Sequence, residues 1–185
     1  MNKPEYIIVH HTGGTDADPL ADTSYHTLEI VDAYHKSLGW NGIGYNWFVE
    51  KTGLLRKGRD EKLTGAHTIG YNNKSIGICL AGNFDATFPT TKQIETLKKL
   101  LEDKSLEYGI TIDKIVPHRK FAKKTCYGVN LSDTWASDLL KNIDIPTIVT
   151  PTEEITIEEP IITPNIASNW LYRALQRLLR YFNII

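Results

Sequence analysis

The hydrophobic positions of residues 1–143 form short runs that alternate with wider, periodic stripes. Apolar or aromatic runs of strand length occur at residues 6–9, 45–49, 75–80 and 115–116. The run at 45–49 is followed by a Thr-Gly turn and the stretch Leu-Leu-Arg-Lys at 54–57, which predicts a hairpin. The run at 75–80 is almost wholly apolar, which is typical of a central strand covered on both faces.

Stripes with a helical period lie between these runs and after the last one, and they predict three helices. The predicted spans are Thr23 or Ser24 to Leu38, Thr90 or Thr91 to Tyr108, and Leu131 to Leu140. Gly39 and Gly109 follow the first two helices as stop signals. The apolar stripe of the first helix comprises Leu28, Val31, Ala33, Tyr34 and Leu38. Strands interleaved with helices predict a single α/β domain built around one sheet.

The charge pattern divides the chain into three segments. Residues 1–143 carry 18 Lys and Arg against 17 Asp and Glu, whereas residues 144–165 carry five acidic residues and no basic one. The second segment also holds four of the eight prolines, and proline together with like charge favours an extended chain. We therefore predict a domain at 1–143 and an acidic linker at 144–165. An edge strand is the alternative for the linker, because ITIEEPII alternates β-branched residues.

The third segment, residues 166–185, carries three arginines and no acidic residue. Its apolar residues recur with a helical period, which predicts a basic amphipathic helix. Such a helix can lie on an anionic membrane or on lipopolysaccharide, or it can dock through its apolar face on the domain or on a second copy. The sequence leaves both alternatives open.

The overall composition excludes several classes of protein. A formal net charge of -1 argues against a nucleic-acid binder, and two cysteines cannot form a disulfide framework. No run of 18 uncharged apolar residues is present, which argues against a membrane-spanning helix. The N-terminal sequence MNKPEYIIVHH lacks the apolar core of a secretory signal peptide, so we expect a protein made in a cytoplasm.

Two histidines and one cysteine stand near the ends of predicted strands. His10 follows the first apolar run, His118 follows the run at 115–116, and Cys126 lies eight residues further along. Two imidazoles and a thiolate are a suitable ligand set for zinc, and three protein ligands leave one position for water. Their spacing alone does not single them out, because a lone histidine or cysteine is more often a buried packing residue.

Four sequence strings, in this order along the chain, resemble the type 2 N-acetylmuramoyl-L-alanine amidase family. They are IIVHHTGG, HKSLGWNGIGYNWFVEKTG, GRDEKLTGAHTIGYNNKSIGICLAGNF and PHRKFAKKTC. The resemblance covers about residues 5–141, and the family includes the amidase-type phage lysozymes and the peptidoglycan recognition proteins. It implies a central mixed β-sheet flanked by helices and a zinc ion in a groove across it. It also implies hydrolysis of the amide between N-acetylmuramic acid and L-alanine in peptidoglycan.

The resemblance implies which residues hold the metal. His10, His118 and Cys126 match the zinc ligands of the phage-lysozyme-like branch, whereas His11 is expected to be a buried hydrogen-bonded partner. The chain departs from the family pattern at Tyr127-Gly128, because Pro-Gly commonly follows the cysteine. This departure removes no predicted ligand.

The resemblance also implies residues that act on the substrate. Lys124 matches a catalytic lysine, and a fixed cation there would stabilise the oxyanion that forms during hydrolysis. Tyr45 matches a tyrosine near the zinc, where it would hydrogen-bond either the attacking water or the oxyanion. His67 matches a position that lines the substrate groove and is expected to contact the substrate.

The predicted function is therefore that of a zinc-dependent peptidoglycan amidase, acting on the cell wall as a phage-type endolysin after synthesis in the host cytoplasm. Two alternatives remain. A cytoplasmic recycling amidase would cut soluble muropeptides, although such enzymes more usually have an aspartate as the third ligand. A non-catalytic peptidoglycan-binding module would share the fold and lack the metal.

Overall fold

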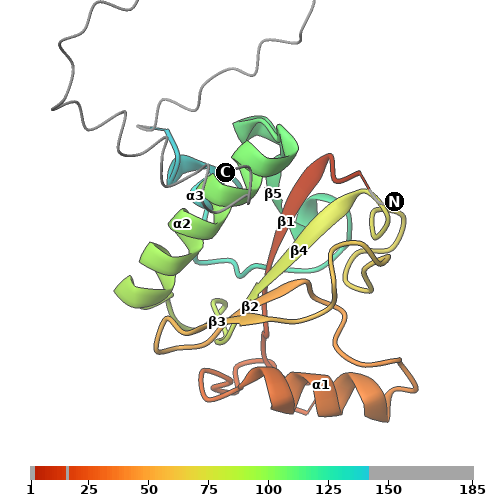
Figure 1. Ribbon diagram of the computed structural model, residues 1–185. Helices are drawn as coiled ribbons and strands as arrows, with labels where there is room; N and C mark the ends of the chain where they lie inside the picture. Colours follow the sequence, from red (N-terminus) through yellow and green to blue (C-terminus); the bar gives the residue numbers. More distant parts are fainter. Residues whose placement is uncertain (1–2, 16, 142–185) are drawn as a thin grey trace, which may run out of the picture. The chain divides into compact units, whose positions relative to one another are not determined.

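A five-stranded sheet forms the centre of the computed structural model, which describes residues 3–15 and 17–141 (Figure 1). The strands are β1 (Tyr6–His11), β2 (Trp47–Val49), β3 (Leu55–Lys57), β4 (Ser75–Leu80) and β5 (Ile115–Pro117). They lie in the order β3-β2-β4-β1-β5; β2 and β3 pair antiparallel, and all other neighbours are parallel. The prediction of a mixed sheet flanked by helices is confirmed. The predicted linker at 144–165 and basic helix at 166–185 lie outside the described residues.

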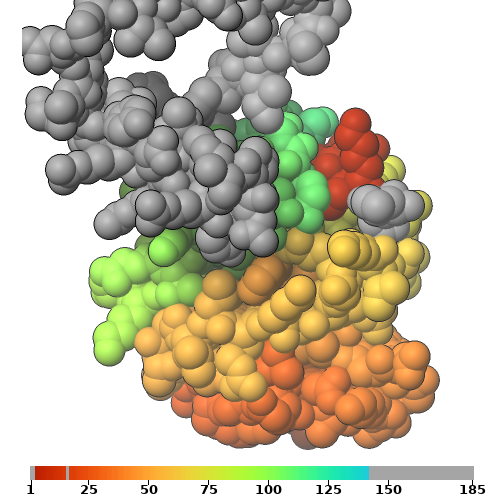
Figure 2. Space-filling model, viewed as in Figure 1, coloured from red at the N-terminus to blue at the C-terminus, as the bar shows by residue number. Residues whose placement is uncertain are grey.

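The two faces of the sheet carry different hydrophobic clusters, because successive side chains of a strand point to opposite faces. On one face, Ile7 and Val9 of β1 pack with Leu97 and Leu101 of α2 (Thr91–Tyr108). On the other face, Phe48 and Cys79 pack with Val31 of α1 (Leu28–Ser37). The two helices therefore cover opposite faces of the sheet (Figure 1). In the space-filling view, α1 forms the lower edge of the visible face, with the residues that follow β3 above it in yellow (Figure 2).

The helix α2 begins and ends where the sequence predicts. The Thr90 side chain accepts a hydrogen bond from the backbone N–H of Gln93, whose own side chain accepts one from the N–H of Thr90. Gly109 ends the helix in the left-handed conformation at φ 66°. Local capping chemistry fixes both ends of this helix.

The helix α1 begins later than predicted. Its N-cap is Thr27, whose hydroxyl accepts from the N–H of Ile30, whereas the Thr23 hydroxyl donates to the carbonyl of Gly13 at 2.6 Å. The predicted apolar stripe is also wrong in part, because Ala33 is exposed and Tyr34 and Leu38 are 55% and 50% exposed. His35 is buried in their place, since its Nδ1 accepts a hydrogen bond from the backbone N–H of Gly44 at 3.1 Å.

Two predicted elements are shorter than expected. β2 begins only at Trp47. Next to it, the backbone N–H of Gly77 donates to the side-chain oxygen of Asn46 at 2.8 Å, where a regular strand would offer a backbone carbonyl. The predicted helix at 131–140 contains only one turn, α3 (Trp135–Asp138). Two short 3₁₀ turns, η1 (Ile112–Lys114) and η2 (His118–Lys120), flank β5.

No helix among the described residues has both the length and the hydropathy needed to cross a membrane.

Candidate metal centre

Parallel strand pairing brings His10 and His118 to the same edge of the sheet. His10 is the penultimate residue of β1, and His118 directly follows β5, which pairs with β1 in the register Val9 to Pro117. Strand alternation turns the two adjacent histidines to opposite faces. The ring of His10 lies 4.6 Å from that of His118, measured between centroids, whereas His11 accepts from the N–H of Phe84 at 3.0 Å. His11 is thus the buried hydrogen-bonded residue that was expected.

Cys126 completes a group of three donors that could hold a metal ion. One donor atom from each of His10, His118 and Cys126 lies within 4.8 Å of the other two. The Nδ1 atom of His10 is 3.7 Å from the sulfur of Cys126. With zinc–nitrogen bonds of about 2.0–2.1 Å and zinc–sulfur bonds of about 2.3 Å, tetrahedral coordination separates such a pair by about 3.6 Å. The donor set therefore fits zinc in both chemistry and spacing.

Burial sets the protonation of these donors. It lowers the pKa of His10 well below its usual value, and it lowers that of His118 with help from the charge of Lys124. Both imidazoles are thus neutral at pH 7 and have a lone pair to donate. Burial raises the pKa of the Cys126 thiol to about 12, although the N–H of His11 and the charge of Lys124 oppose this shift. Metal binding at this site must therefore release the thiol proton.

Tyr45 and Lys124 line the same cavity as the three donors. The cavity has a volume of about 320 Å³, and the loop at 12–15 forms another part of its wall. The half-buried ring of Tyr45 lies 5.0 Å from that of His10, between centroids. Burial raises the pKa of its phenol well above the usual value, so Tyr45 is a hydrogen-bond donor at neutral pH. Lys124 is exposed and brings a positive charge to the cavity.

The loop that carries Cys126 is held by residues that the sequence analysis missed. The guanidinium of Arg119 donates to the carbonyls of Gly128 at 2.7 Å and Leu131 at 2.6 Å. The carboxylate of Asp85 accepts from the N–H of Val129 at 2.8 Å. Arg119 lies in the string PHRKFAKKTC, which is the signal that could have found it, whereas the sequence around Asp85 gives no comparable signal.

The residue after the cysteine packs inward even though it is not proline. Tyr127 is fully buried, and its hydroxyl donates to the carbonyls of Ser132 and Asp133 at 2.8 and 3.1 Å. These bonds engage carbonyls within the predicted helix at 131–140, which explains why only one turn forms there. The departure from Pro-Gly therefore leaves the loop closed around the sulfur.

His67 lies against His10 and is not among the residues that line the cavity. Its Nδ1 is 3.1 Å from the Nε2 of His10. Burial is the main cause that lowers its pKa, to about 3, so the ring is neutral at pH 7. The expected contact of His67 with substrate stays a prediction.

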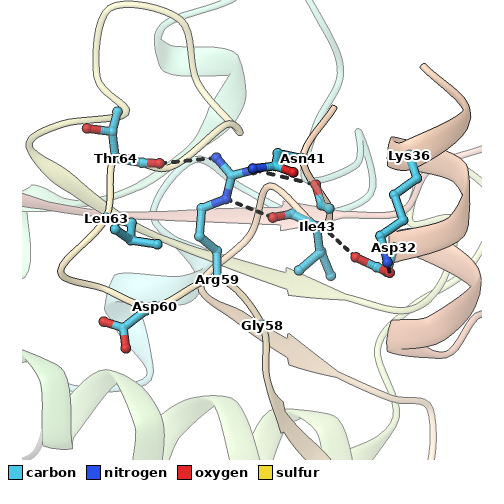
Figure 3. A pocket seen from close by; sticks show the side chains of 10 residues that line it. Asp32, Lys36, Asn41, Ile43, Gly58, Arg59, Asp60, Leu63 and Thr64 are labelled. Atoms are coloured by element: carbon cyan, nitrogen blue, oxygen red, sulfur yellow. Dashed lines mark hydrogen bonds and ion pairs between the residues drawn. The ribbon is translucent and has the colours of Figure 1, made fainter. Parts of the chain in front are cut away.

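A second cavity, of about 410 Å³, lies between α1 and the residues that follow β3 (Figure 3). Arg59 crosses it and donates to the carbonyls of Ile43 at 2.9 Å and Thr64 at 3.1 Å. Asp32 of α1 accepts from the N–H of Ile43 at 2.8 Å. The backbone N–H of Arg59 also donates to the carbonyl of Tyr45 at 2.9 Å. These contacts fix the backbone that places Tyr45 in the first cavity.

Comparisons with known proteins find one family model and several relatives that match this chain. A family model described as N-acetylmuramoyl-L-alanine amidase (Amidase_2) matches residues 1–129. "Peptidoglycan-recognition protein SC2" of Drosophila melanogaster is 35% identical over 141 residues, which are 74% of this chain and 76% of that protein. "Endolysin" of Escherichia phage T7 is 34% identical over 120 residues, which are 62% of this chain and 78% of that protein. Among solved structures, "Endolysine N-acetylmuramoyl-L-alanine amidase LysCS from Clostridium intestinale URNW" matches with a TM-score of 0.61 and 31% identity, covering 69% of this chain and 77% of that one.

Proposed function

The chain belongs to the N-acetylmuramoyl-L-alanine amidase family, and on that premise we propose that it cuts the amide between N-acetylmuramic acid and L-alanine in peptidoglycan with a zinc ion. The expected enzyme class is confirmed by the family. His10, His118 and Cys126 are the proposed zinc ligands. The observation that carries this proposal is the convergence of these three donors within 4.8 Å. Tyr45 and Lys124 line the same cavity.

Each residue has a role that follows from its chemistry. Bound at the three donors, zinc would lower the pKa of a water molecule and polarise the carbonyl of the scissile amide. Lys124 supplies a positive charge beside the carbonyl oxygen, where negative charge develops during hydrolysis. Tyr45, protonated at neutral pH, donates a hydrogen bond to the attacking water or to that oxygen.

We propose that the biological setting is degradation of the bacterial cell wall by a phage-type endolysin. Relatives named endolysin in two enterobacterial phages and a Klebsiella phage support this setting, although peptidoglycan recognition proteins are equally related. Contact of residues 166–185 with an anionic membrane or lipopolysaccharide stays a prediction.

The test uses the full chain on purified peptidoglycan sacculi. We expect release of new N-terminal L-alanine with zinc present and loss of this release after treatment with a chelator. Cys126→Ala should abolish both bound zinc and activity, whereas Cys79→Ala, which removes a buried thiol outside the donor group, should keep stoichiometric zinc. Cleavage of soluble fragments alone would favour the recycling amidase. Binding without any cleavage would favour a non-catalytic module.

Lys124 has a matched control in its exposed neighbour Lys123. Removing one stabiliser of an oxyanion costs about 3 kcal/mol of the barrier, which is roughly a 100-fold loss in kcat. We expect this loss for Lys124→Met and near-normal kcat for Lys123→Met, with zinc content unchanged in both. Equal kcat values for the two variants would remove Lys124 from the proposed mechanism.

A further inference from the structure

The two ring nitrogens of His10 face different partners. Its Nδ1 lies 3.7 Å from the sulfur of Cys126, on the side where the three donors converge. Its Nε2 points the opposite way and lies 3.1 Å from the Nδ1 of His67. A neutral imidazole carries one proton, and a nitrogen that bears a proton cannot bind a metal. The metal site therefore requires the proton of His10 to be on Nε2.

We propose that His67 is a positioning residue, which accepts the Nε2 proton of His10 and thereby holds that ring in the tautomer and orientation needed to bind the metal. This inference rests on the proposed function, since it assumes that His10 binds a metal. Histidine ligands almost always donate their second N–H to a fixed acceptor, usually a carboxylate, a carbonyl or water. Here the acceptor is a second imidazole.

The direction of this hydrogen bond is set by a chain of contacts that ends on a backbone carbonyl. The hydroxyl of Ser75 donates to the carbonyl of Tyr71 at 2.7 Å, and a carbonyl can only accept. The Ser75 oxygen, 3.4 Å from the Nε2 of His67, is then left to accept from that nitrogen. A neutral His67 protonated on Nε2 has a free lone pair on Nδ1. His10 must therefore be the donor in the contact between the two rings.

The hydroxyl of Thr68 lies beside the same pair and is compatible with this direction. Its oxygen is 3.0 Å from the Nδ1 of His67 and 3.4 Å from the Nε2 of His10. The Nδ1 of His67 has one lone pair, so when it accepts from His10 the Thr68 hydroxyl cannot also donate to it. In the proposed arrangement the Thr68 oxygen is instead a second acceptor beside the Nε2 proton of His10.

The backbone around His67 is built to hold its ring in place. A Cβ added at Gly77 would lie 2.5 Å from the ring, and one added at Gly65 would lie 2.7 Å from it, so only glycine leaves room at either position. The side-chain oxygen of Asn72 accepts from the backbone N–H groups of His67 at 2.8 Å and Thr68 at 2.7 Å. The ring is thus fixed behind His10, away from the wall of the cavity.

The experiment compares three substitutions of His67 in the full chain. In His67→Asn the Oδ1 atom can occupy the place of the histidine Nδ1 and accept the same proton. In His67→Gln the terminal atoms reach the place of Nε2 instead. In His67→Leu the side chain has no hydrogen-bond acceptor. We expect His67→Asn to bind zinc within about threefold of the wild type. His67→Gln and His67→Leu should bind it about 10–100-fold more weakly. Competition with a chelator measures the affinity, and the visible spectrum of the cobalt(II) form reports on the ligand geometry.

A fourth variant, outside His67, keeps the test valid if the His67 variants fail to fold. Ser75→Ala keeps both histidines and removes only the acceptor that orients His67, so we expect a severalfold loss of zinc affinity. Equal zinc affinity in all four variants and the wild type would overturn the inference while leaving the proposed function intact. The same affinity for His67→Asn and His67→Gln, both weakened, would also overturn it. Failure of the wild type to bind zinc would instead refute the proposed function, and this inference with it.

Discussion

Gly77 offers the sharpest test of how the fold holds the candidate site, because it lies in β4 directly beneath the ring of His67. A Cβ added there would lie 2.5 Å from the Cδ2 atom and 2.6 Å from the Cγ atom of that ring. Carbon atoms in favourable contact are about 3.5–4.0 Å apart. Gly77→Ala therefore forces the His67 ring to move by about 1 Å, since the strand cannot shift between its two neighbours.

Two consequences follow from this movement, and both have an expected size. Inserting a methyl group into a well-packed site costs about 1–3 kcal/mol of unfolding free energy. The contact between His10 and His67, now 3.1 Å, would lengthen to about 4 Å, which is too long for a hydrogen bond. Gly77→Ala should thus destabilise the protein by about 2 kcal/mol and weaken zinc binding about as much as His67→Leu does.

A double-mutant cycle tests whether the clash is the cause. His67→Ala removes the ring, and with it the three atoms that lie nearest to the added methyl group of Gly77→Ala. Urea unfolding should show a cost of about 2 kcal/mol for Gly77→Ala in the wild type and less than about 0.5 kcal/mol in the His67→Ala background. The reasoning would be refuted by an equal cost in both backgrounds, because the strain would then come from the strand itself.

Three further predictions concern protons and the loop around the sulfur. Since zinc binding releases one proton from Cys126, zinc affinity should rise about tenfold per pH unit between pH 6 and 8. Isothermal titration calorimetry in buffers of different ionisation enthalpy should show that one proton is released for each zinc ion bound. Burial lowers the pKa of His11 to about 4, so the neutral ring is favoured in the folded protein. Its contribution to the free energy of unfolding is fully present above pH 6.5 and is lost as the pH falls towards 4, by about 3 kcal/mol in total. Urea unfolding at pH 7 and 4.5 should therefore show a smaller acid loss for His11→Asn than for the wild type, and equal losses would contradict this. In Arg119→Lys a single ammonium group replaces the two guanidinium nitrogens that separately reach the carbonyls of Gly128 and Leu131. The substitution should cost about 2 kcal/mol in the same assay, whereas a change below about 0.5 kcal/mol would show that the guanidinium contacts contribute little.

The elements that the sequence predicts best are those fixed by local chemistry. The helix α2 has a capping Thr90 at its start and Gly109 at its end, and both signals are legible within a few residues. The strand at 75–80 is predicted with its final bounds, because a run buried on both faces is apolar throughout. In each case the side chains that define the element act on their own neighbourhood.

The start and the buried face of α1 depend on distant residues, and the sequence therefore misplaces them. Thr23 looks like an N-cap, but its hydroxyl is engaged by the carbonyl of Gly13. Tyr34 looks like a core residue, but His35 takes the inward position because the backbone N–H of Gly44 needs an acceptor there. No pattern within the helix encodes these tertiary partners.

The three proposed ligands were identified through resemblance to a family, and their spacing alone could not have done so. His10 and Cys126 are 116 residues apart, and they meet only because β5 returns in parallel beside β1. Resemblance also places His67 on the substrate groove, and that contact stays a prediction; the structure adds the contact of its ring with His10, which the resemblance does not indicate.

The place of His10 within the sheet explains why a second histidine can control its ring. β1 pairs with β4 at His10 and His11, and it pairs with β5 as far as Val9, so the backbone at His10 has little freedom to move. The side chain then has only rotation about its own bonds left to choose between the sulfur of Cys126 and other partners. A contact on Nε2, opposite the metal, removes that freedom without occupying the metal's side of the ring. A rigid strand supplies the position, and His67 supplies the orientation that the strand alone leaves free.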